Sequence, residues 1–367
     1  MDETPKNLWK GYDDKYQFHV TIPIIDSTIE SKNVDERVIY IGDVEKRKQA
    51  YGICGECKEP GTGYNWCQSY IVQCYGITQD PKNKEYMMVL YYCNDGNLRN
   101  YLNESKNYIN YKLKIDQLQQ IARGLLDIHN AEKVHKDFHS GNILFNYMPY
   151  ISDLGMCQPA NIKQTVKEEG IYGVLPYMAP EVLHERQYTK AAEIYSFGII
   201  MNEFLSEEIP FNDIPHDEFL AIKICKGFRP TISKDIPKLL ADLIIKCWDA
   251  EIKNRPTTKE LYQTLNRWYN GTDNQNSEIY FQIKECDKTR EEKFKNKSNE
   301  NKSKSFKTHP QAIYTSRLLN FKNLPKPTTS YTAQSTSANP ISECLDVQLS
   351  ELLELNEICQ DDEHNIE

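Results

Sequence analysis

The sequence has no apolar run long enough to cross a membrane. A transmembrane helix needs about 18 or more consecutive apolar residues, and no segment of this chain approaches that length. The first residues, MDETPK, also lack the basic-then-apolar pattern of a secretory signal. We therefore expect a cytoplasmic chain with no membrane partner, and the nucleus is the alternative location.

Positive charge is also in short supply. The 367 residues include 44 Lys and Arg against 53 Asp and Glu, which gives a formal net charge of -9. General binding of nucleic acid usually needs a basic face, so the composition argues against a nucleic-acid partner. The 11 cysteines are scattered and odd in number, and without a secretory signal we expect them to stay reduced.

The character of the sequence changes twice along the chain. Residues 1–66 are mixed and form an N-terminal extension, with short strands expected at residues 16–25 and 37–41. Residues 67–270 alternate apolar segments with turns, which is typical of a folded domain. Residues 271–367 are predominantly polar and follow as a tail.

The tail has too few apolar residues to build a core of its own. Residues 288–307 are rich in Lys, Asn, Ser and Glu, and residues 342–367 are acidic without any Lys or Arg. Such segments bury too little apolar surface to offset the loss of chain entropy. We expect a disordered tail over residues 271–367, with at most a short helix near residues 347–358.

Apolar periodicity predicts a strand and several helices within the folded domain. Residues 85–92, EYMMVLYY, are a short apolar run rich in aromatics, which is typical of a buried strand. Residues 112–130 place Leu118, Ile121 and Leu125 on one face of a helix. Further helices are expected at residues 191–205, 216–226, 236–248 and 258–268.

Three polar segments carry the chemistry. Residues 134–145 read VHKDFHSGNILF, Asp153-Leu154-Gly155 begins eleven residues after Asn142, and residues 176–181 read PYMAPE. An Asp or Asn alone in a loop is usually a turn former or a cap. In this order and at this spacing, however, the segments resemble the protein-kinase set H-R-D-x-x-x-x-N, D-F-G and A-P-E.

The resemblance covers residues 70–268 and is nearest to the tyrosine-kinase-like group, within a large fungal expansion of it. It implies an α+β, protein-kinase-like fold, with a complete, mostly helical C-lobe at about residues 95–270. The N-lobe, which opens the kinase domain at residue 67, is then truncated. Besides the DFHSGN loop, the segments that carry this likeness are residues 76–81 (GITQDP), 188–203 (YTKAAEIYSFGIIMNE) and 308–311 (THPQ).

The resemblance also implies an activity and assigns residues to it. The reaction is ATP-dependent transfer of a phosphoryl group to protein Ser/Thr or Tyr hydroxyls, in signalling. Asp137 is the catalytic aspartate that orients the hydroxyl and accepts its proton, with Lys136 beside it. Asn142 and Asp153 supply oxygen ligands to Mg²⁺.

The nucleotide base and the lobe's framework receive residues in the same way. Leu144 is expected to pack beneath the adenine ring, and Tyr91 and Cys93 belong to the hinge segment at its edge. The residues with structural roles are His135 of the loop, Glu193 as the loop's anchor, and Glu181 in a buried ion pair with Arg255. Arg255 as a plain surface residue is the alternative.

Four positions depart from the family pattern. Lys136 replaces the usual Arg and grips a phosphate less directionally than a guanidinium, so activation by phosphorylation is not expected to be strong. Glu193 replaces an Asp and sets its carboxylate one methylene further out. Leu154 replaces Phe, and Val174 stands where Ser/Thr kinases often have Thr, which blurs the substrate preference.

The sequence lacks the segments that normally cover the phosphates of ATP. No G-x-G-x-x-G-x-V segment and no V-A-I-K-like tetrapeptide precedes Asp137, and Gly61-Thr62-Gly63 is more typical of a plain turn. Residues 66–69 pass almost directly into residues 71–75, which resemble the fourth strand of an N-lobe. Because glycine-loop amides and a strand Lys normally hold the triphosphate, we expect weak ATP binding and slow transfer.

A partial cysteine pattern lies in the same region. Cys54, Cys57 and Cys67 resemble three quarters of a C-x-x-C…C-x-x-C zinc module, but Tyr70 occupies the fourth position. A closed zinc site needs four ligands, and Cys74 is a distant substitute. We expect reduced thiols and not a zinc site.

Three functions are compatible with these residues. The first is an active protein kinase, and the second is an inactive kinase-like module that binds or scaffolds partners. The third is a small-molecule phosphotransferase, because H-x-D-x-H-x-x-N loops occur there as well. The A-P-E segment and Arg255 are expected to build a platform for protein substrates, which favours the protein kinase.

Overall fold

The computed structural model describes residues 9–12, 17–20, 70–79, 85–105, 108–160, 170–185, 187–299, 308–321 and 323–328. At the N-terminus, β1 (Trp9–Tyr12) pairs antiparallel with β2 (Gln17–Val20), which lies inside the strand expected at residues 16–25. The expectations for residues 37–41, for the three cysteines of the partial zinc pattern and for residues 347–358 lie outside the described residues.

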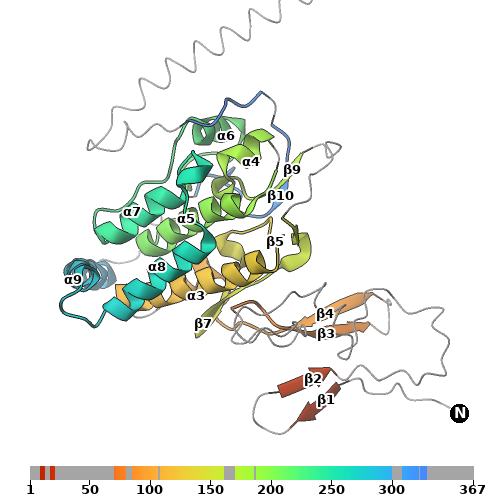
Figure 1. Ribbon diagram of the computed structural model, residues 1–367, viewed down its shortest axis with the longest axis horizontal. Helices are drawn as coiled ribbons and strands as arrows, with labels where there is room; N and C mark the ends of the chain where they lie inside the picture. The colour runs from red at the N-terminus through yellow and green to blue at the C-terminus, as the bar shows by residue number, and fades with distance from the viewer. Residues whose placement is uncertain are drawn as a thin grey trace, which may run out of the picture. The chain divides into compact units, whose positions relative to one another are not determined.

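A group of packed helices forms the larger part of the described structure (Figure 1). Helix α3 begins where the Asn110 side chain accepts the Leu113 N–H, and such capping satisfies a donor that the first turn leaves open. Helix α3 packs against α8, and α5 packs against α7. These four helices are α3 (Tyr111–Asn130), α5 (Lys190–Ser206), α7 (Lys238–Cys247) and α8 (Thr258–Gly271).

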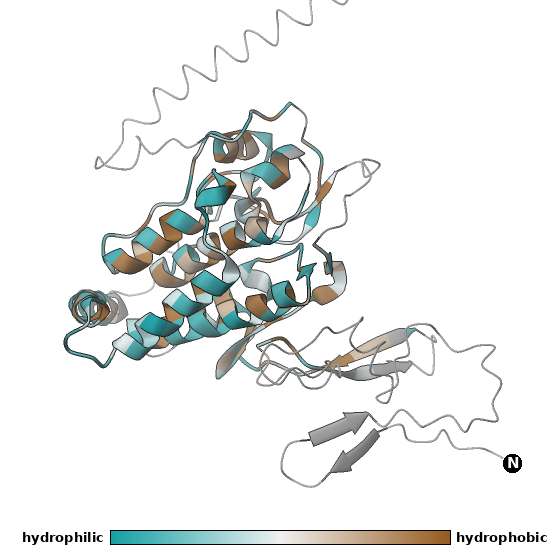
Figure 2. Cartoon of the chain, in the orientation of Figure 1, coloured by the Kyte–Doolittle hydropathy of each residue, from teal (hydrophilic) through white to brown (hydrophobic). Residues whose placement is uncertain are grey.

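Helix α5 is the central helix of this lobe. Every residue from Ala192 to Ser206 is buried, as expected for a helix that packs on all sides. The exposed helices instead alternate apolar and polar faces (Figure 2). At Gly198 a Cβ would lie 2.8 Å from the Cβ of Cys247, so glycine permits the close approach of α5 and α7.

All five helices expected from periodicity are present, within a few residues of their expected ends. The fifth of them is α6 (Glu218–Cys225). Two further helices in this region are α2 (Leu98–Glu104) and α4 (Pro180–Glu185). Single 3-10 turns occur at η1 (Ser140–Asn142), η2 (Leu154–Met156), η3 (Leu175–Tyr177) and η4 (Ile252–Asn254). No helix within the described ranges is both long and apolar enough to span a bilayer.

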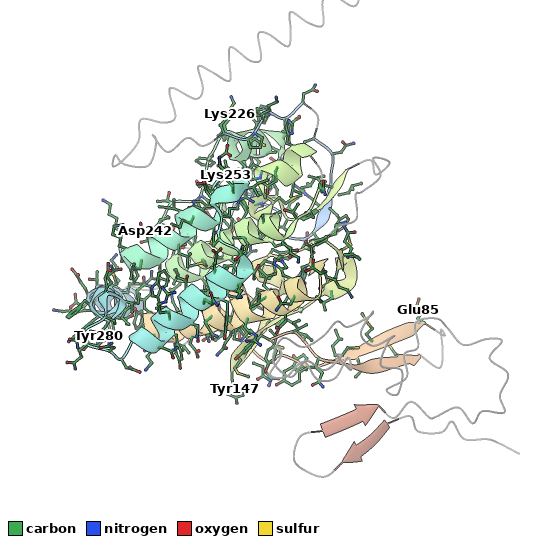
Figure 3. The ribbon with its side chains drawn as sticks, viewed as in Figure 1. Glu85, Tyr147, Lys226, Asp242, Lys253 and Tyr280 are labelled. Carbon is green, nitrogen blue, oxygen red and sulfur yellow. The ribbon has the colours of Figure 1, made fainter. Side chains whose placement is uncertain are left out.

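The strands of the domain form short antiparallel pairs. The pairs that build the two lobes' strands are β3 (Cys74–Gln79) with β4 (Tyr86–Leu90), β5 (Lys133–Val134) with β8 (Gln158–Pro159), and β6 (Ile143–Asn146) with β7 (Met148–Ile151). Tyr147, at the turn between β6 and β7, projects into solvent (Figure 3).

The strand expected at residues 85–92 is confirmed as β4, but its expected burial is wrong. Met87, Met88 and Leu90 are 45%, 67% and 46% exposed. Within the described residues β4 pairs only with β3. A strand is buried on both faces only where further layers cover it, and a run of apolar letters does not say whether those layers exist.

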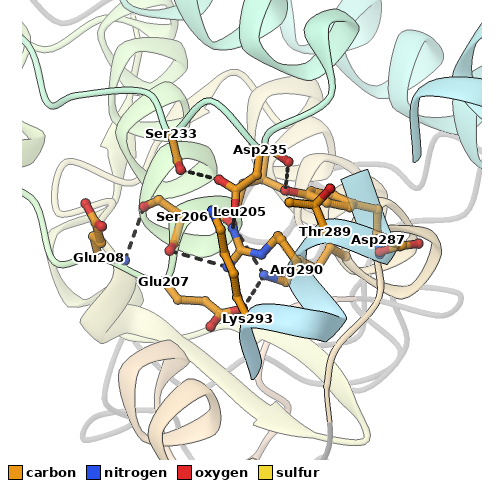
Figure 4. Close-up of polar contacts among 12 residues, drawn as sticks. Leu205, Ser206, Glu207, Glu208, Ser233, Asp235, Asp287, Thr289, Arg290 and Lys293 are labelled. Carbon is orange, nitrogen blue, oxygen red and sulfur yellow. Dashed lines mark hydrogen bonds and ion pairs between the residues drawn. The ribbon is translucent and has the colours of Figure 1, made fainter. Parts of the chain in front are cut away.

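The expectation of disorder from residue 271 onward is wrong for helix α9 (Glu278–Asn299). Ile279 and Ile283 lie on one face of α9 and are buried in the core. Two turns further on, Arg290 donates to the Leu205 carbonyl at 2.8 Å and pairs with Glu207 at 3.0 Å (Figure 4). The expectation rested on the polar composition of residues 288–307, whereas the buried isoleucines of α9 precede that run.

The same expectation is wrong for the segment from residue 308 to residue 328. Its strand β10 (Arg317–Leu319) pairs antiparallel with β9 (Ile171–Gly173), and Leu319 and Leu324 are buried. In Figure 1 the blue β10 runs beside β9. The helical lobe therefore supplies the apolar surface that the segment's own composition lacks.

Candidate active site

The polar loop expected to be catalytic runs between β5 and β6 and is tied to α5 by Glu193. One Glu193 carboxylate oxygen accepts the Lys136 N–H at 2.7 Å, and the other lies 2.8 Å from Nε2 of His129. Glu193 is only 1% exposed. The longer carboxylate at this position therefore still reaches the loop backbone.

The Lys136 side chain reaches strand β8. The Lys136 backbone has φ of 69°, a left-handed conformation that is uncommon for a non-glycine residue. Its Nζ donates to Oε1 of Gln158 at 3.3 Å. The Lys136 backbone, held by Glu193, thus shapes the loop, while its amine contacts the β8 strand.

Asp137 is buried and held from several sides. Its backbone N–H donates to Nδ1 of His135 at 3.3 Å, and the other ring nitrogen of His135 lies 2.8 Å from the Ser152 carbonyl. Asn142 donates its amide N–H to the Asp137 carbonyl at 2.9 Å and to Oδ2 at 3.4 Å. The carboxylate is therefore fixed in direction before any substrate arrives.

His139 is a neighbour of Asp137 that was not assigned a role from the sequence. Its Nδ1 accepts the Gly141 N–H at 3.0 Å, so a neutral ring carries its proton on Nε2. That Nε2 lies 3.5 Å from Oδ2 of Asp137. The signal was available, since His139 stands inside the DFHSGN loop two residues from the aspartate.

A hydroxyl group from far along the chain also meets this carboxylate. Oγ of Ser316 lies 2.5 Å from both carboxylate oxygens of Asp137. Burial alone would raise the pKa of Asp137, but the hydrogen bond and charge of His139 and the hydrogen bond from Ser316 hold it below its ordinary value. Asp137 is thus held as an ionised carboxylate that accepts a hydrogen bond from a serine hydroxyl.

The β6–β7 hairpin brings the two expected metal ligands to the same end. Ile143 pairs with Ile151, and the next residue outward, Ser152, donates its N–H to the Asn142 carbonyl at 2.8 Å. Asp153 follows directly, exposed and in a left-handed conformation with φ of 58°. Asn142 and Asp153 therefore flank one end of the hairpin.

The donor set at this end suits Mg²⁺. The Asn142 amide nitrogen donates to Asp137, so its oxygen is the atom that would serve as a metal ligand, and Asp153 is exposed. Mg²⁺ is usually held by one or two protein oxygens together with substrate phosphates and waters. Over the described parts of the chain, no cluster of three or more His, Cys, Asp or Glu forms a separate metal site.

The residues expected near the adenine lie on joined segments. Leu144 on β6 is half-buried and bridges to Asn97, and the Phe145 N–H donates to the Gly96 carbonyl at 2.8 Å. Cys93, three residues after the end of β4, is buried, and burial raises the pKa of its thiol. The hinge segment is thus attached to the strand that carries Leu144.

Tyr91 makes a side-chain contact of its own. Its hydroxyl accepts a hydrogen bond from the Asn146 amide at 2.5 Å, and its ring centroid lies 5.4 Å from that of Tyr150. The Tyr91 side chain is therefore engaged within the protein, so that only its backbone could face an adenine edge. The Tyr91 N–H is engaged as well, because it donates to the Gln73 carbonyl.

Glu181 and Arg255 form the expected ion pair, away from the aspartates. The two guanidinium nitrogens lie 2.6 and 2.8 Å from the two carboxylate oxygens. The Arg255 side chain is completely buried, and it also donates to the carbonyls of Asp249 and Ala191. The alternative of a surface arginine is therefore wrong, and this bidentate pair fastens α4 to the chain before α8.

A second buried cluster, centred on Glu203, was not expected from the sequence. Its oxygens accept hydrogen bonds from Arg99 at 2.9 Å, Tyr177 at 2.6 Å and Ser140 at 3.1 Å. Ser140 belongs to the catalytic loop and Tyr177 to η3. Because these residues are up to 104 positions apart, no local sequence pattern predicts the cluster.

Comparison with known proteins agrees with these observations. Residues 64–265 match the protein tyrosine and serine/threonine kinase family. The serine/threonine-protein kinase VIK of Arabidopsis thaliana is 32% identical over 209 residues, which are 54% of this chain and 46% of the plant protein. The serine/threonine/tyrosine-protein kinase HT1 of the same plant is 28% identical over 202 residues, 54% of this chain and 50% of HT1.

A relative from another organism gives a similar result. A probable serine/threonine-protein kinase of Dictyostelium discoideum is 29% identical over 213 residues, 54% of this chain and 12% of that protein. The chain thus spans half or less of the length of these relatives. The family match covers more than half of the chain and includes the catalytic loop, both aspartates and the buried ion pair, and the chain belongs to the protein kinase family.

Proposed function

We propose that the chain transfers the γ-phosphoryl group of ATP to serine or threonine hydroxyls of proteins, as a member of the tyrosine-kinase-like group. The observation that carries this proposal is the serine hydroxyl of Ser316, 2.5 Å from both oxygens of the buried Asp137. A general base must lie within hydrogen-bonding distance of the proton that it removes. The serine/threonine kinases among the relatives support the same preference.

The residues of the loop have separate tasks in this proposal. Asp137 orients the acceptor hydroxyl and accepts its proton, and His139 and Asn142 fix the direction of the carboxylate. Bound Mg²⁺ would neutralise negative charge on the triphosphate, and the oxygens of Asn142 and Asp153 would hold it. Glu193 keeps the loop backbone in place through the Lys136 N–H.

A kinase-like module that binds proteins without transferring phosphate is the second candidate. The sequence favours it in one respect: no glycine-loop motif and no V-A-I-K-like tetrapeptide precedes Asp137. Several groups that stabilise charge would then be absent together, and removal of one such donor typically costs about 10²–10³ in rate. We therefore expect transfer to be slow and stabilisation by Mg-ATP to be small.

Phosphate transfer by the purified full chain tests the proposal. With Mg-ATP and a general protein substrate, Asp137→Asn should lower the initial rate by at least about 10²-fold, because it removes the base. Asp242→Asn is the matched control, since Asp242 is an exposed residue of α7 (Figure 3). It should leave the rate unchanged.

Two outcomes would count against this assignment. A folded wild-type chain that transfers no phosphate to any protein would favour the binding module, and an Asp137→Asn variant at wild-type rate would remove Asp137 from the mechanism. The melting temperature with and without Mg-ATP measures nucleotide binding separately, since a ligand of the native state raises stability by mass action. A rise of several degrees would contradict the weak binding that we expect.

A further inference from the structure

The segment of residues 308–321 lies across the catalytic loop with a serine at its centre. The Ser316 hydroxyl has one proton, and it meets both oxygens of the Asp137 carboxylate at 2.5 Å. Ser316 and Asp137 are 179 positions apart. A contact of this kind therefore depends on the whole segment being held in place.

Backbone pairing holds the segment on the C-terminal side of the serine. In the β9–β10 register, Arg317 lies opposite Gly173, and Leu319 lies opposite Ile171. The β9 strand lies between the Asp153 turn and helix α4 in the sequence. Adding an extended strand to an existing edge is a common way for a protein to bind a peptide, so β10 is held as a bound peptide would be.

Side chains hold the segment on both sides of the serine. On the N-terminal side, Tyr314 donates its hydroxyl to the Pro210 carbonyl at 2.8 Å, and the Arg99 guanidinium lies 3.9 Å from its ring centroid. On the other side, Arg317 donates to the His216 carbonyl at 2.5 Å, and Leu319 is buried. These anchors leave Ser316 little freedom to move away from Asp137.

The segment also reaches the polar cluster beneath the catalytic loop. Arg99, whose guanidinium covers Tyr314, pairs with Glu203 at 2.9 Å, and Glu203 accepts a hydrogen bond from Ser140 of the loop. The neighbouring residue, Thr315, is exposed. Of the two adjacent hydroxyl residues, only Ser316 faces the aspartate.

We propose that Ser316 is an intramolecular phosphoacceptor, and that its segment occupies the groove in which protein substrates bind. This rests on the proposed kinase activity. Ser316 Oγ forms a bond to the γ-phosphorus of ATP while the bond from that phosphorus to the β–γ bridging oxygen breaks. The electron pair of that bond leaves with ADP, and the hydroxyl proton passes to Asp137.

The product of this step differs from the starting contact in charge. A phosphoserine carries about -1.5 to -2 charges at neutral pH, whereas Asp137 accepts a hydrogen bond from a neutral hydroxyl. Two negative groups in contact repel each other, so the modified segment is released from Asp137. Phosphorylation of Ser316 then precedes phosphorylation of other proteins.

The test uses the full chain and follows where phosphate is added. Wild type, Ser316→Ala and the matched control Thr315→Ala are incubated with Mg-ATP, and modified residues are located by mass spectrometry. Ser316 should be the first site modified, and Thr315→Ala should not change its rate. Ser316→Ala should lower the initial incorporation at least about tenfold, because it removes the positioned acceptor.

Dilution separates an intramolecular reaction from one between molecules. The fraction of Ser316 modified per minute should stay constant over about 100-fold dilution, since an acceptor on the same chain has a fixed effective concentration. Phosphate on other proteins without phosphate on Ser316 would overturn this inference while leaving the kinase activity standing. A rate that rises in proportion to protein concentration would also overturn it.

A measurement without ATP tests the groove separately. A Cβ at position 170 would lie 2.5 Å from the Leu319 carbonyl oxygen, so Gly170→Ala should displace β10. Hydrogen exchange in β9 should then rise at least about tenfold. Equal exchange in wild type and variant would overturn the occupied groove, whereas absence of transfer to any protein would overturn the kinase activity and with it the acceptor role of Ser316.

Discussion

Helix α9 and the segment of residues 308–321 both lie beyond the part of the chain that matches the kinase family, and both come from a stretch of polar composition. They are attached by different means. Helix α9 buries Ile279 and Ile283 and places Arg290 among carbonyls and carboxylates, whereas the segment uses backbone pairing and a hydroxyl on Asp137. Polar composition thus indicates whether a segment can fold alone, but it does not indicate whether the segment becomes ordered by packing against a folded lobe.

The largest effect is expected on the α9 side. Arg290→Met should lower the free energy of unfolding by about 2–3 kcal/mol, somewhat less than a fully buried pair because Glu207 is 35% exposed. The control is Lys295→Met on the same helix, which removes an exposed pair with Glu291 and should cost less than about 0.5 kcal/mol. Urea unfolding measures both, and equal losses would show that α9 is not held through Arg290.

A smaller effect on global stability is expected from the other side. Leu319→Ala should weaken docking of β10 and speed exchange of the β9 amides, yet shift the urea midpoint less than Arg290→Met does. The reason is that the segment can leave before the lobe unfolds. Leu318→Ala is the matched control because Leu318 is 60% exposed. A midpoint shift for Leu319→Ala as large as that of Arg290→Met would erase the difference between the two segments.

A pH-dependent effect is expected at Lys114, which shares the Glu207 carboxylate with Arg290. Burial lowers the pKa of Lys114 to about 8, although its Nζ lies 2.7 Å from Glu207. The unfolded chain, with a pKa near 10.5, binds more protons between these values, so stability should rise as pH increases from 8 toward 10.5. Lys114→Met should remove this rise. Unfolding free energies of both proteins at several pH values check it, and parallel curves would contradict it.

Local patterns predicted the helices and the catalytic loop well. Helices α3, α7 and α8 have strong apolar periodicity, and α5 and α6 are predominantly apolar. The spacing of Asp137, Asn142 and Asp153 follows from one loop and one hairpin. The burial of β4 could not be predicted in this way, because it depends on layers outside the strand. The domain boundaries at residues 66 and 270 stay predictions.

The unpredicted parts of the site all depend on distant contacts. Glu203 meets Arg99, and Ser316 meets Asp137, only because the folded lobe brings them together. Charge and composition are averages over a segment, so they do not predict that one serine or one arginine contacts a residue far away in the sequence. His139 is different, since its place in the loop could have been used.

The pairing of β10 with β9 has a consequence for finding substrates. In the proposed groove, β10 belongs to the same chain as β9, so a free peptide would compete with an occupant whose effective concentration is on the order of millimolar. Peptide libraries offered to the wild-type chain before Ser316 is modified should therefore bind far more weakly than they do to the open groove. The sequence YTSRLL at residues 314–319 is the first template to test, and a chain carrying Leu319→Ala is the better reagent for the search.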